Sequence, residues 1–444
     1  MMVADLFTDE YRQLKNILPL LLDEETGIIG SLEEMPRQTD MSDIFYYKAT
    51  VANTGIISGL QDDFPVTAGT SLMRDRAIAK AVGEAIERYC SALYSTSEMI
   101  WGTYGELKSP AIHPDQCILF SKEQLKSHGF VIHPFTPTTP VWWTESINLI
   151  SGYPILIPAC FIYCPYQIDK VQKEVQICET MSTGLAAHLT FEAATLNGIM
   201  EVIERDNFML TWSFKISHPR IDLSSLNDSH LDLIKQFNRV GYTINILYGV
   251  FETGIPTIIS VMRGNNEGNV PLIVSCATHL DPALGVTKSL EELALMERFC
   301  KRAMITPSSI RSEKRGKEVI GLLDHIFYWL NPKHLHHADF LTLSDCKISL
   351  QDLLSRSKGD AHSDLNEVSA HLHTCGYEIY VADITTPDID TLGIKVVRVF
   401  IPDLMPLNKS HRHVAFGSKR FTAFREKAKV KLNTTINSIP HPFA

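Results

Sequence analysis

Apolar residues recur with helical spacing in several long segments of the chain. Between residues 74 and 94, Ala77, Ala81 and Ala85 stand four residues apart, and further apolar residues follow the same face. This spacing is typical of a helix with one apolar face. The same kind of pattern predicts helices over residues 10–22, 190–214 (with Thr190 as N-cap) and about 288–304.

Shorter segments alternate apolar residues with turn formers, which predicts strands and hairpins over residues 141–163. A helix, a Gly-Tyr pair, a strand, a loop and a second strand occur in this order over residues 231–261 and again over residues 366–401. Glycine just past a helix end is the expected left-handed cap, so the two copies have two alternative explanations. One is an old duplication, and the other is an independent origin of each copy. The interleaved elements predict a mixed α/β protein with several sheets, and the first sixty residues look peripheral.

Composition limits the classes of protein to which the chain can belong. Its 444 residues carry 41 Lys and Arg against 51 Asp and Glu, a net charge of −10, which argues against a non-specific nucleic-acid binder. No apolar stretch approaches the roughly 18 residues of a membrane-spanning helix, and no signal peptide is evident. The nine cysteines contain no Cys-x-x-Cys pair, so we expect reduced thiols and a cytoplasmic protein. Walker-type, dinucleotide-binding and His-Glu-x-x-His motifs do not occur.

Two of the predicted helices carry a distinctive polar pattern. Both contain Glu-x-Ile-Glu-Arg in an otherwise apolar stretch, once at residues 84–88 and once at residues 201–205. Residues three and four positions apart share a helix face, so each set forms one stripe. The first stripe consists of Glu84, Glu87 and Arg88, and the second of Asn197, Glu201, Glu204 and Arg205.

The spacing alone leaves two interpretations of these stripes open. Glu-x-x-Glu-Arg is common on helices and often forms a solvated salt-bridge stripe. Alternatively, the flanking alanines and isoleucines indicate burial, and buried carboxylates need cations. The four glutamates and Asp206 exceed the two arginines in charge, so a divalent ion would balance the remainder. Carboxylate and amide oxygens suit Mg²⁺, which often bridges substrate phosphates, and this second interpretation is a Mg–nucleotide site.

Beyond spacing, the ordered motifs along roughly residues 60–444 resemble those of the YcaO family. The matching segments are Gly69-Thr70-Ser71 with Arg76–Cys90, Ser182–Asp206 with Trp212, His279–Pro282 with Ser289–Ala294, Gly393–Pro402, and Phe416–Arg420. The resemblance implies a YcaO-like fold in which several β-sheets and long carboxylate-bearing helices form an ATP site. It also implies a division into an N-terminal extension (residues 1–60) and a catalytic domain (residues 61–444).

The resemblance further implies an activity, cofactors and site residues. YcaO cyclodehydratases use ATP and Mg²⁺ to phosphorylate a peptide amide oxygen, so that Cys, Ser or Thr side chains close to thiazoline or oxazoline. The family's metal positions fall on Glu84, Glu87, Glu201 and Glu204, and its other nucleotide positions on Arg88, Asn197, Arg205 and Glu292. Where the family often has a basic residue after the third helix stripe, this chain has Glu297 followed by Arg298, and Arg298 is assigned to the nucleotide.

The C-terminus carries a further resemblance. Cyclodehydratases of the family typically end in Pro-x-Pro-x-Pro, a tail that reaches the active site. This chain ends Pro440-His441-Pro442-Phe443-Ala444, so two prolines match and the last residue departs from the pattern. The resemblance therefore assigns Pro442 and Ala444 to the catalytic site and places the C-terminal carboxylate near the nucleotide.

The expected partners follow from the same resemblance. The substrate is a ribosomally made precursor peptide. About sixty residues precede the first signature, too few for both a leader-binding module and an adenylation-like scaffold, so we expect a separate leader-peptide-binding protein. A flavin-dependent dehydrogenase in the same complex and a homo-oligomeric state are also implied, whereas nucleic acid and membrane are not. Thioamide or amidine formation and a non-catalytic peptide- or nucleotide-binding scaffold are the alternatives.

Overall fold

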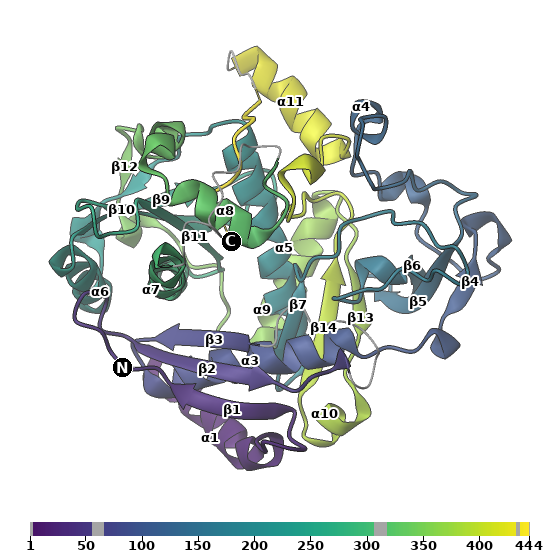
Figure 1. Cartoon of the computed structure of the whole chain (residues 1–444), viewed down its shortest axis with the longest axis horizontal. Helices are drawn as coiled ribbons and strands as arrows, with labels where there is room; N and C mark the ends of the chain where they lie inside the picture. The colour runs from purple at the N-terminus through teal and green to yellow at the C-terminus, as the bar shows by residue number, and fades with distance from the viewer. Residues whose placement is uncertain (1–2, 56–65, 306–317, 432–435, 444) are drawn as a thin grey trace.

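The computed structural model describes residues 3–55, 66–305, 318–431 and 436–443, which form three β-sheets with helices between them (Figure 1). The first sheet has the order β1 (Ile29–Glu34), β2 (Phe45–Val51), β3 (Val66–Ser71). The second has the order β11 (Leu272–Thr278), β10 (Thr257–Gly264), β9 (Tyr242–Gly249), β8 (Arg220–Ile221), β12 (Lys347–Ile348). The third has the order β4 (Ile100–Gly102), β5 (Val141–Asn148), β13 (Tyr380–Asp383), β14 (Lys395–Phe400), β7 (Leu185–His188), and β6 (Pro154–Pro158) pairs with β5.

The α-helices in the same ranges separate and cover these sheets. They are α1 (Val3–Leu21), α3 (Arg74–Ala92), α4 (Lys122–Leu125), α5 (Phe191–Ser213), α6 (Asp228–Arg239), α7 (Pro282–Met304), α8 (Leu322–Trp329), α9 (Ala361–Thr374), α10 (Pro387–Thr391) and α11 (Lys419–Lys431). The mixed α/β class and the long helices predicted from periodicity are confirmed. Among the described residues, no helix combines the length and apolar character that a membrane crossing requires.

The alanine-rich face of α3 packs on the first sheet. Ala77, Ala81 and Ala85 are fully buried there. The contact is so close that a Cβ on Gly69 of β3 would lie 2.1 Å from the carbonyl oxygen of Ala77. Small residues on both elements therefore bring the helix against the sheet, and the polar stripe of α3 is left on another side of the helix.

Helix α5 lies at the centre of the molecule, between the second and third sheets (Figure 1). The predicted cap is present, because the Thr190 hydroxyl accepts a hydrogen bond from the Ala193 amide at 3.2 Å. Gly184 has a φ of +87°, and a Cβ there would meet the Val399 carbonyl of β14 at 2.3 Å. Gly198 approaches the same valine side chain, so glycines on both sides allow α5 to sit directly on the third sheet.

Helix α7 begins earlier than the apolar periodicity predicted. The expected start was near Lys288, whereas the helix begins at Pro282. The Asp281 carboxylate caps it by accepting the Ala283 amide at 2.8 Å, and proline is favoured at the first helical position. These local signals, rather than apolar spacing, determine where the helix starts.

The repeated order of elements appears in two different sheets. Helix α6 leads to the antiparallel pair β9 and β10 in the second sheet, and α9 leads to the antiparallel pair β13 and β14 in the third. The predicted left-handed glycines end both helices, with φ of +90° at Gly241 and +89° at Gly376. Strand β13 is shorter than predicted, beginning at Tyr380.

The described part of the predicted N-terminal extension takes part in the core rather than lying at the periphery. Strand β2 pairs along its length with β3, and Ala49 is fully buried. Beyond the sheet, the Ser42 hydroxyl donates to Glu297 of α7 at 2.8 Å, and Lys301 pairs with Asp40 at 2.7 Å. The division into residues 1–60 and 61–444 stays a prediction, and its boundary falls among residues outside the described ranges.

Candidate functional site

The two polar stripes predicted from the sequence line one cavity at the centre of the molecule. The cavity has a volume of about 2260 Å³ and lies where α3, α5 and α7 approach one another. Of the predicted site residues, those that line it are Glu84, Glu87, Arg88, Asn197, Glu201, Arg205, Glu292 and Arg298. Glu204 joins them through an ion pair with Arg205. Three helices far apart in the sequence therefore contribute to a single site.

On α3, both glutamates are oriented by backbone amides of neighbouring strands. The Glu87 carboxylate accepts the amide of Ala187 in β7 at 2.9 Å, and Glu84 accepts the amide of Ala68 in β3 at 3.3 Å. Arg88 donates to Glu84 at 3.2 Å, one helical turn away. These bonds hold the carboxylates at the cavity wall while leaving other lone pairs of each carboxylate available.

The α5 stripe is held in the same way. Glu201 accepts the amide of Gly184 at 2.9 Å, and Glu204 accepts the amide of Thr278 in β11 at 2.9 Å. The Arg205 guanidinium donates one nitrogen to Glu201 at 3.1 Å and the other to Glu204. One arginine therefore fixes two carboxylates at once, a geometry that suits the planar fork of a guanidinium.

Burial makes these carboxylates reluctant to ionise. It raises the pKa of Glu87 to about 8, and the negative charge of Glu201 on the other helix adds to the rise. Burial likewise raises the pKa of Glu204 to about 7, with a contribution from Glu292 of α7. Desolvation also raises the pKa of Glu292, and Glu84 of α3 adds to this rise. The negative charges of carboxylates on three helices thus raise one another's pKa values. A bound cation would have the opposite effect and favour the ionised forms.

One basic group that lines the cavity was not predicted from the sequence. Lys288 lines the cavity, and burial together with the charges of Arg76 and Lys80 lowers its pKa to about 8. Lys80 itself pairs with the buried Glu291 at 2.7 Å. The sequence did contain a signal that Lys288 lies at the site. It stands four residues before Glu292, which places both residues on one face of α7.

Arg298 lies further along α7 and is held by the N-terminal segment. Its guanidinium donates to the carbonyl oxygens of Ser42 and Ile44 at 3.2 and 3.4 Å, and it stacks 5.3 Å from the centre of the Tyr46 ring. It lines the cavity, but these contacts engage it away from the glutamate stripes. Its assignment to the nucleotide stays a prediction.

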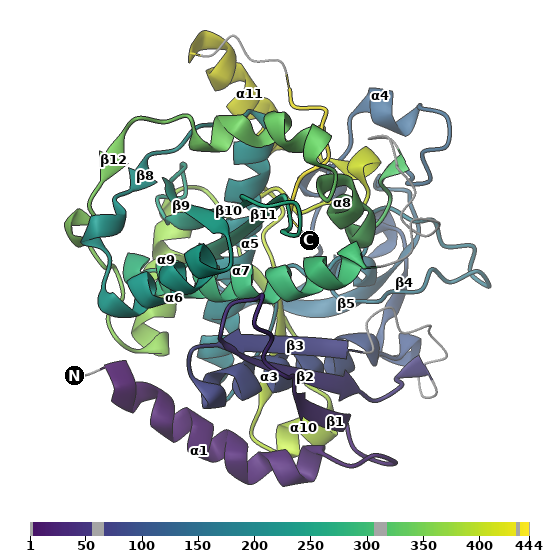
Figure 2. The ribbon, with the colours of Figure 1, turned by 60° about the vertical axis from the view of Figure 1, so that its left-hand side comes forward.

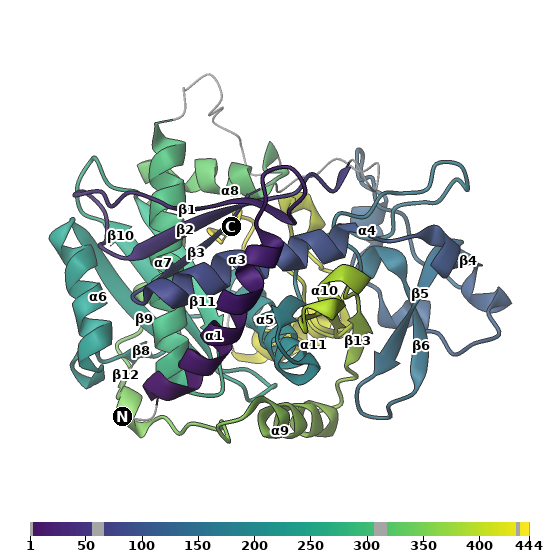
Figure 3. The same cartoon turned by 90° about the horizontal axis from the view of Figure 1, so that it is seen from below.

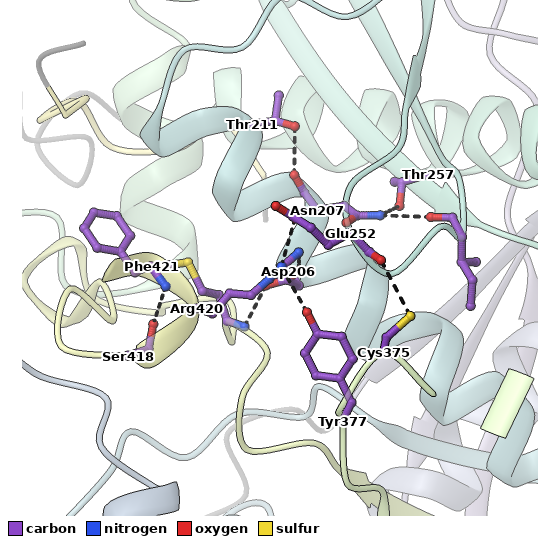
Figure 4. Close-up of polar contacts among 12 residues, drawn as sticks. Asp206, Asn207, Thr211, Glu252, Thr257, Cys375, Tyr377, Ser418, Arg420 and Phe421 are labelled. Atoms are coloured by element: carbon purple, nitrogen blue, oxygen red, sulfur yellow. Dashed lines mark hydrogen bonds and ion pairs between the residues drawn. The ribbon is translucent and has the colours of Figure 1, made fainter. Parts of the chain in front are cut away.

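Asp206 does not belong to the carboxylate set to which its sequence position assigned it. It is fully buried and forms a bidentate ion pair with Arg420, whose Nε and Nη2 lie 2.9 and 2.8 Å from one carboxylate oxygen (Figure 4). Arg420 also donates to Glu252 and Tyr377, both at 3.0 Å. The excess charge that suggested a cation therefore comes from the glutamates alone, since Asp206 has its own partner.

The C-terminal tail is bound in a groove rather than exposed. Three consecutive carbonyl oxygens of the tail accept hydrogen bonds from aromatic side chains of α5 and α8. The pairs are Trp212 with Ile439 at 2.8 Å, Trp329 with Pro440 at 3.0 Å and His325 with His441 at 2.8 Å. The His325 and His441 rings also stack, 3.8 Å apart. The tail is thereby held against α5 and α8.

The last described residue of the tail, Phe443, reaches the glutamate stripe. Its ring is buried, packs 4.9 Å from Phe208 and lies 4.5 Å from the Arg205 guanidinium. Phe443 also lines the cavity. Pro442 precedes it in the groove, and Ala444 lies outside the described residues. The tail therefore lies beside the glutamate stripe at Phe443, and the catalytic roles of Pro442 and Ala444 stay predictions.

The donor set fits Mg²⁺ bound together with phosphate. In the described part of the chain, no three His, Cys, Asp or Glu side chains cluster closely enough to form a metal site by themselves. Mg²⁺ usually takes one or two protein carboxylates and completes its shell with water and substrate phosphates. Glutamates spaced around a cavity, with raised pKa values and arginines among them, are suited to that arrangement.

Known proteins resemble the chain over most of its length. A protein of Methanothermobacter thermautotrophicus described as uncharacterized is 26% identical over 346 residues, covering 76% of this chain and 81% of its own. A solved structure of a heterocyclase in complex with substrate and cofactor superposes with a TM-score of 0.77 at 22% identity, covering 98% of this chain. The chain spans only 57% of that heterocyclase's length.

A second solved structure matches along nearly the full length of both chains. The YcaO of Methanopyrus kandleri bound with AMPPCP and Mg²⁺ has a TM-score of 0.67 at 16% identity, covering 91% of this chain and 93% of that one. A family model described as "YcaO cyclodehydratase, ATP- and Mg²⁺-binding" matches residues 68–405. The predicted cofactors, ATP and Mg²⁺, are those of the family. Together the motifs, the fold and the match to the family model show that this chain is a member of the YcaO family.

Proposed function

We propose that this protein is an ATP-dependent cyclodehydratase that forms thiazolines or oxazolines in a ribosomally made precursor peptide. The observation that carries the proposal is the convergence of the Glu87 and Glu201 stripes on one cavity that the C-terminal tail also enters. The likeness to heterocyclase structures supports the same reaction class.

In the proposed reaction, a Cys, Ser or Thr side chain loses its thiol or hydroxyl proton to solvent and attacks the preceding amide carbon. A C–S or C–O bond forms, the C=O π bond opens, and the amide oxygen becomes an oxyanion. That oxygen takes the γ-phosphoryl group of ATP, and the bond to ADP breaks. Phosphate then leaves with the former amide oxygen while the nitrogen loses its proton, giving the C=N bond of the azoline. Overall, ATP and the peptide are converted to ADP, phosphate and the azoline. The peptide loses the equivalent of one water, and the oxygen of that water leaves as part of the phosphate.

The proposed roles follow from what each side chain contacts. Glu84, Glu87, Glu201 and Glu204 would hold Mg²⁺, which when bound neutralises charge on the phosphates and polarises the phosphoryl group. Ion pairs keep Glu84 in position through Arg88, and Glu201 and Glu204 through Arg205. The roles proposed for the remaining residues are nucleotide binding for Asn197, Glu292 and Arg298, and catalysis for Pro442 and Ala444.

The tail suggests how the proton could be handled. Phe443 lies beside Arg205, and Ala444 follows it in the sequence. We propose that the Ala444 carboxylate accepts the proton lost from the peptide nitrogen. A tag added after Ala444 would move the charge away, so it should reduce cyclisation more than it reduces binding of a non-hydrolysable ATP analogue.

The assembly is proposed on the same basis. A precursor peptide, a separate leader-binding protein, a flavin-dependent dehydrogenase and a second copy of this chain are the expected partners, in the cytoplasm. Full cyclisation by the isolated chain at the rate seen with a leader-binding protein would refute the need for that partner.

A thioamide- or amidine-forming YcaO is the second candidate. The phosphate chemistry is shared with azoline formation and only the nucleophile differs, so this candidate would use the same residues of the ATP site. Mass spectrometry of a treated peptide distinguishes the products, because azoline formation removes one water and thioamide formation exchanges oxygen for sulfur. Treating that peptide with iodoacetamide then separates azoline from amidine closure, since only azoline formation from Cys consumes the thiol. Absence of phosphate release with any precursor peptide and partner protein would instead favour the non-catalytic scaffold.

A further inference from the structure

One face of α7 changes from charged to apolar along the cavity. Lys288 and Glu292 occupy its charged end, Leu295 and Phe299 follow, and Arg302 lies at its far end. Spacings of four and three residues place all five on one row of the helix. A peptide lying along this row would pass from the glutamate stripe to an apolar surface.

Helix α8 adds apolar side chains to the same wall. Figures 2 and 3 show α8 beside the C-terminal end of α7. Leu322 and Leu323 line the cavity, whereas His325 and Trp329 face the tail. We call Leu295, Phe299, Leu322 and Leu323 the α7–α8 patch.

The side chains of the patch are unusually exposed for apolar residues beside a site. Phe299 is 45% and Leu323 is 51% exposed. Among the described residues, the hydrophobic clusters that form the core include Leu290, Leu293 and Ala294 of α7 but none of the patch. Apolar surface that lines a cavity without packing on the core is typical of a ligand-binding surface.

We propose that the α7–α8 patch binds an apolar side chain of the substrate peptide, about three residues from the residue that is modified. The inference rests on the proposed function and names the class of peptide sequence that the site selects. Seven residues separate Glu292 from Phe299, a rise of about 10 Å along a helix. An extended peptide covers that distance in about three residues.

The occupant is the substrate peptide because the patch and the glutamate stripes line one continuous cavity. A peptide that presents its amide to the glutamates must leave the site along one of the cavity walls. The α7–α8 wall offers apolar contact directly beyond Glu292. A second copy of this chain could instead cover the patch, and this is an outcome of the test below.

The test measures peptide binding without turnover. Fluorescein-labelled Gly/Ser peptides carry one Cys and a single Leu at successive distances on either side, and a matched series carries Asp in place of Leu. Fluorescence anisotropy follows their binding to the full chain with Mg²⁺ and a non-hydrolysable ATP analogue. The variants are Phe299→Asp and Leu323→Asp. Tyr153→Ala is the control, because Tyr153 is 74% exposed in the turn between β5 and β6.

We expect the peptide with Leu about three residues from Cys to bind about tenfold more tightly than its Asp counterpart. This preference should persist in Tyr153→Ala and disappear in Phe299→Asp and Leu323→Asp, while binding of the ATP analogue is unchanged. Equal binding of the two series, or a preference that survives both patch variants, overturns the inference. So does a change of oligomeric state, measured by light scattering, in both patch variants without a change in peptide preference.

Failure of the proposed function gives a different result. Loss of water from the same peptides, measured by mass spectrometry with ATP, reports on cyclodehydration. If the chain dehydrates the Leu and Asp series equally, the proposed function stands and this inference is wrong. If the chain prefers the Leu series but removes no water even when a leader-binding partner and its leader sequence are supplied, the peptide site stands and the cyclodehydratase is contradicted.

Discussion

The ring of Phe443 lies 4.5 Å from the guanidinium of Arg205, so the C-terminal tail contacts the arginine that holds Glu201 and Glu204 of α5. A cation over an aromatic face is stabilised by the ring quadrupole, more so where water is excluded. Docking of the tail and the geometry of the carboxylate stripe are therefore linked through one side chain.

Replacing Phe443 by alanine should weaken binding of Mg–ATP. The cation–π contact is worth about 0.5–2 kcal/mol, which corresponds to roughly 2- to 30-fold in affinity if the arginine is mispositioned without it. Titration calorimetry with a non-hydrolysable ATP analogue measures the change. Phe443→Tyr keeps the aromatic face and should bind like the wild type; equal affinities in the alanine and tyrosine variants would contradict the link.

Arg205→Lys should impair the site although it keeps the charge. A lysine presents one ammonium group and cannot give separate nitrogens to Glu201 and Glu204 as the guanidinium does. We expect at least about a tenfold loss of analogue affinity, since a partly broken buried ion pair is costly. Arg239→Lys, at the exposed end of α6, is the matched control. Wild-type affinity in Arg205→Lys would show that the bridge is not needed.

Binding of Mg²⁺ with the nucleotide should release protons near neutral pH. Burial raises the pKa of Glu87 to about 8 and that of Glu204 to about 7, so both are partly protonated in the metal-free protein. The ion binds the ionised form, so its affinity should rise as pH increases through about 7 to 8 and then level off. Calorimetry in buffers of different protonation enthalpy counts the protons. Glu87→Gln should reduce the count, and an unchanged count would contradict the assignment.

The same pKa shifts predict the opposite trend for stability of the metal-free protein. Both groups have folded-state pKa values above the ordinary value of 4.5, so the stabilisation they provide is complete at acidic pH. It is lost as pH rises toward about 8. Thermal unfolding across this range checks the sign, and Glu87→Gln should flatten the dependence.

The buried pair of Asp206 and Arg420 should matter for folding rather than for nucleotide binding. Asp206→Asn leaves the guanidinium without its charged partner in the interior, which costs about 3–5 kcal/mol in the free energy of unfolding. Urea denaturation measures this cost. Glu252→Gln removes a half-exposed partner of the same arginine and should cost less. A larger loss in Glu252→Gln than in Asp206→Asn would contradict this account.

The elements that carry the glutamates were predictable because their signals are local. Alanine spacing identified α3, the Thr190 cap identified the start of α5, and positions three and four apart identified which glutamates share a face. Helical geometry follows from near neighbours, so a single sequence suffices for it.

The partners of these side chains were not predictable, because they come from distant segments. Asp206 follows Arg205 directly, yet its partner Arg420 lies more than two hundred positions later. Arg298 is held by Ser42 and Ile44, and His325 by the tail. Spacing in one helix defines a stripe but not the chain that faces it, which only tertiary packing determines.

The central claim is that α3 and α5 jointly hold one Mg–ATP, and a double-mutant cycle of Glu87→Gln and Glu201→Gln tests it directly. Affinity for the Mg-bound ATP analogue is measured by calorimetry for the wild type, both single variants and the double variant. Carboxylates that share an ion are coupled, so each single change should weaken binding strongly and the double change should cost clearly less than their sum. Additive effects, or wild-type affinity in either single variant, would contradict a shared site.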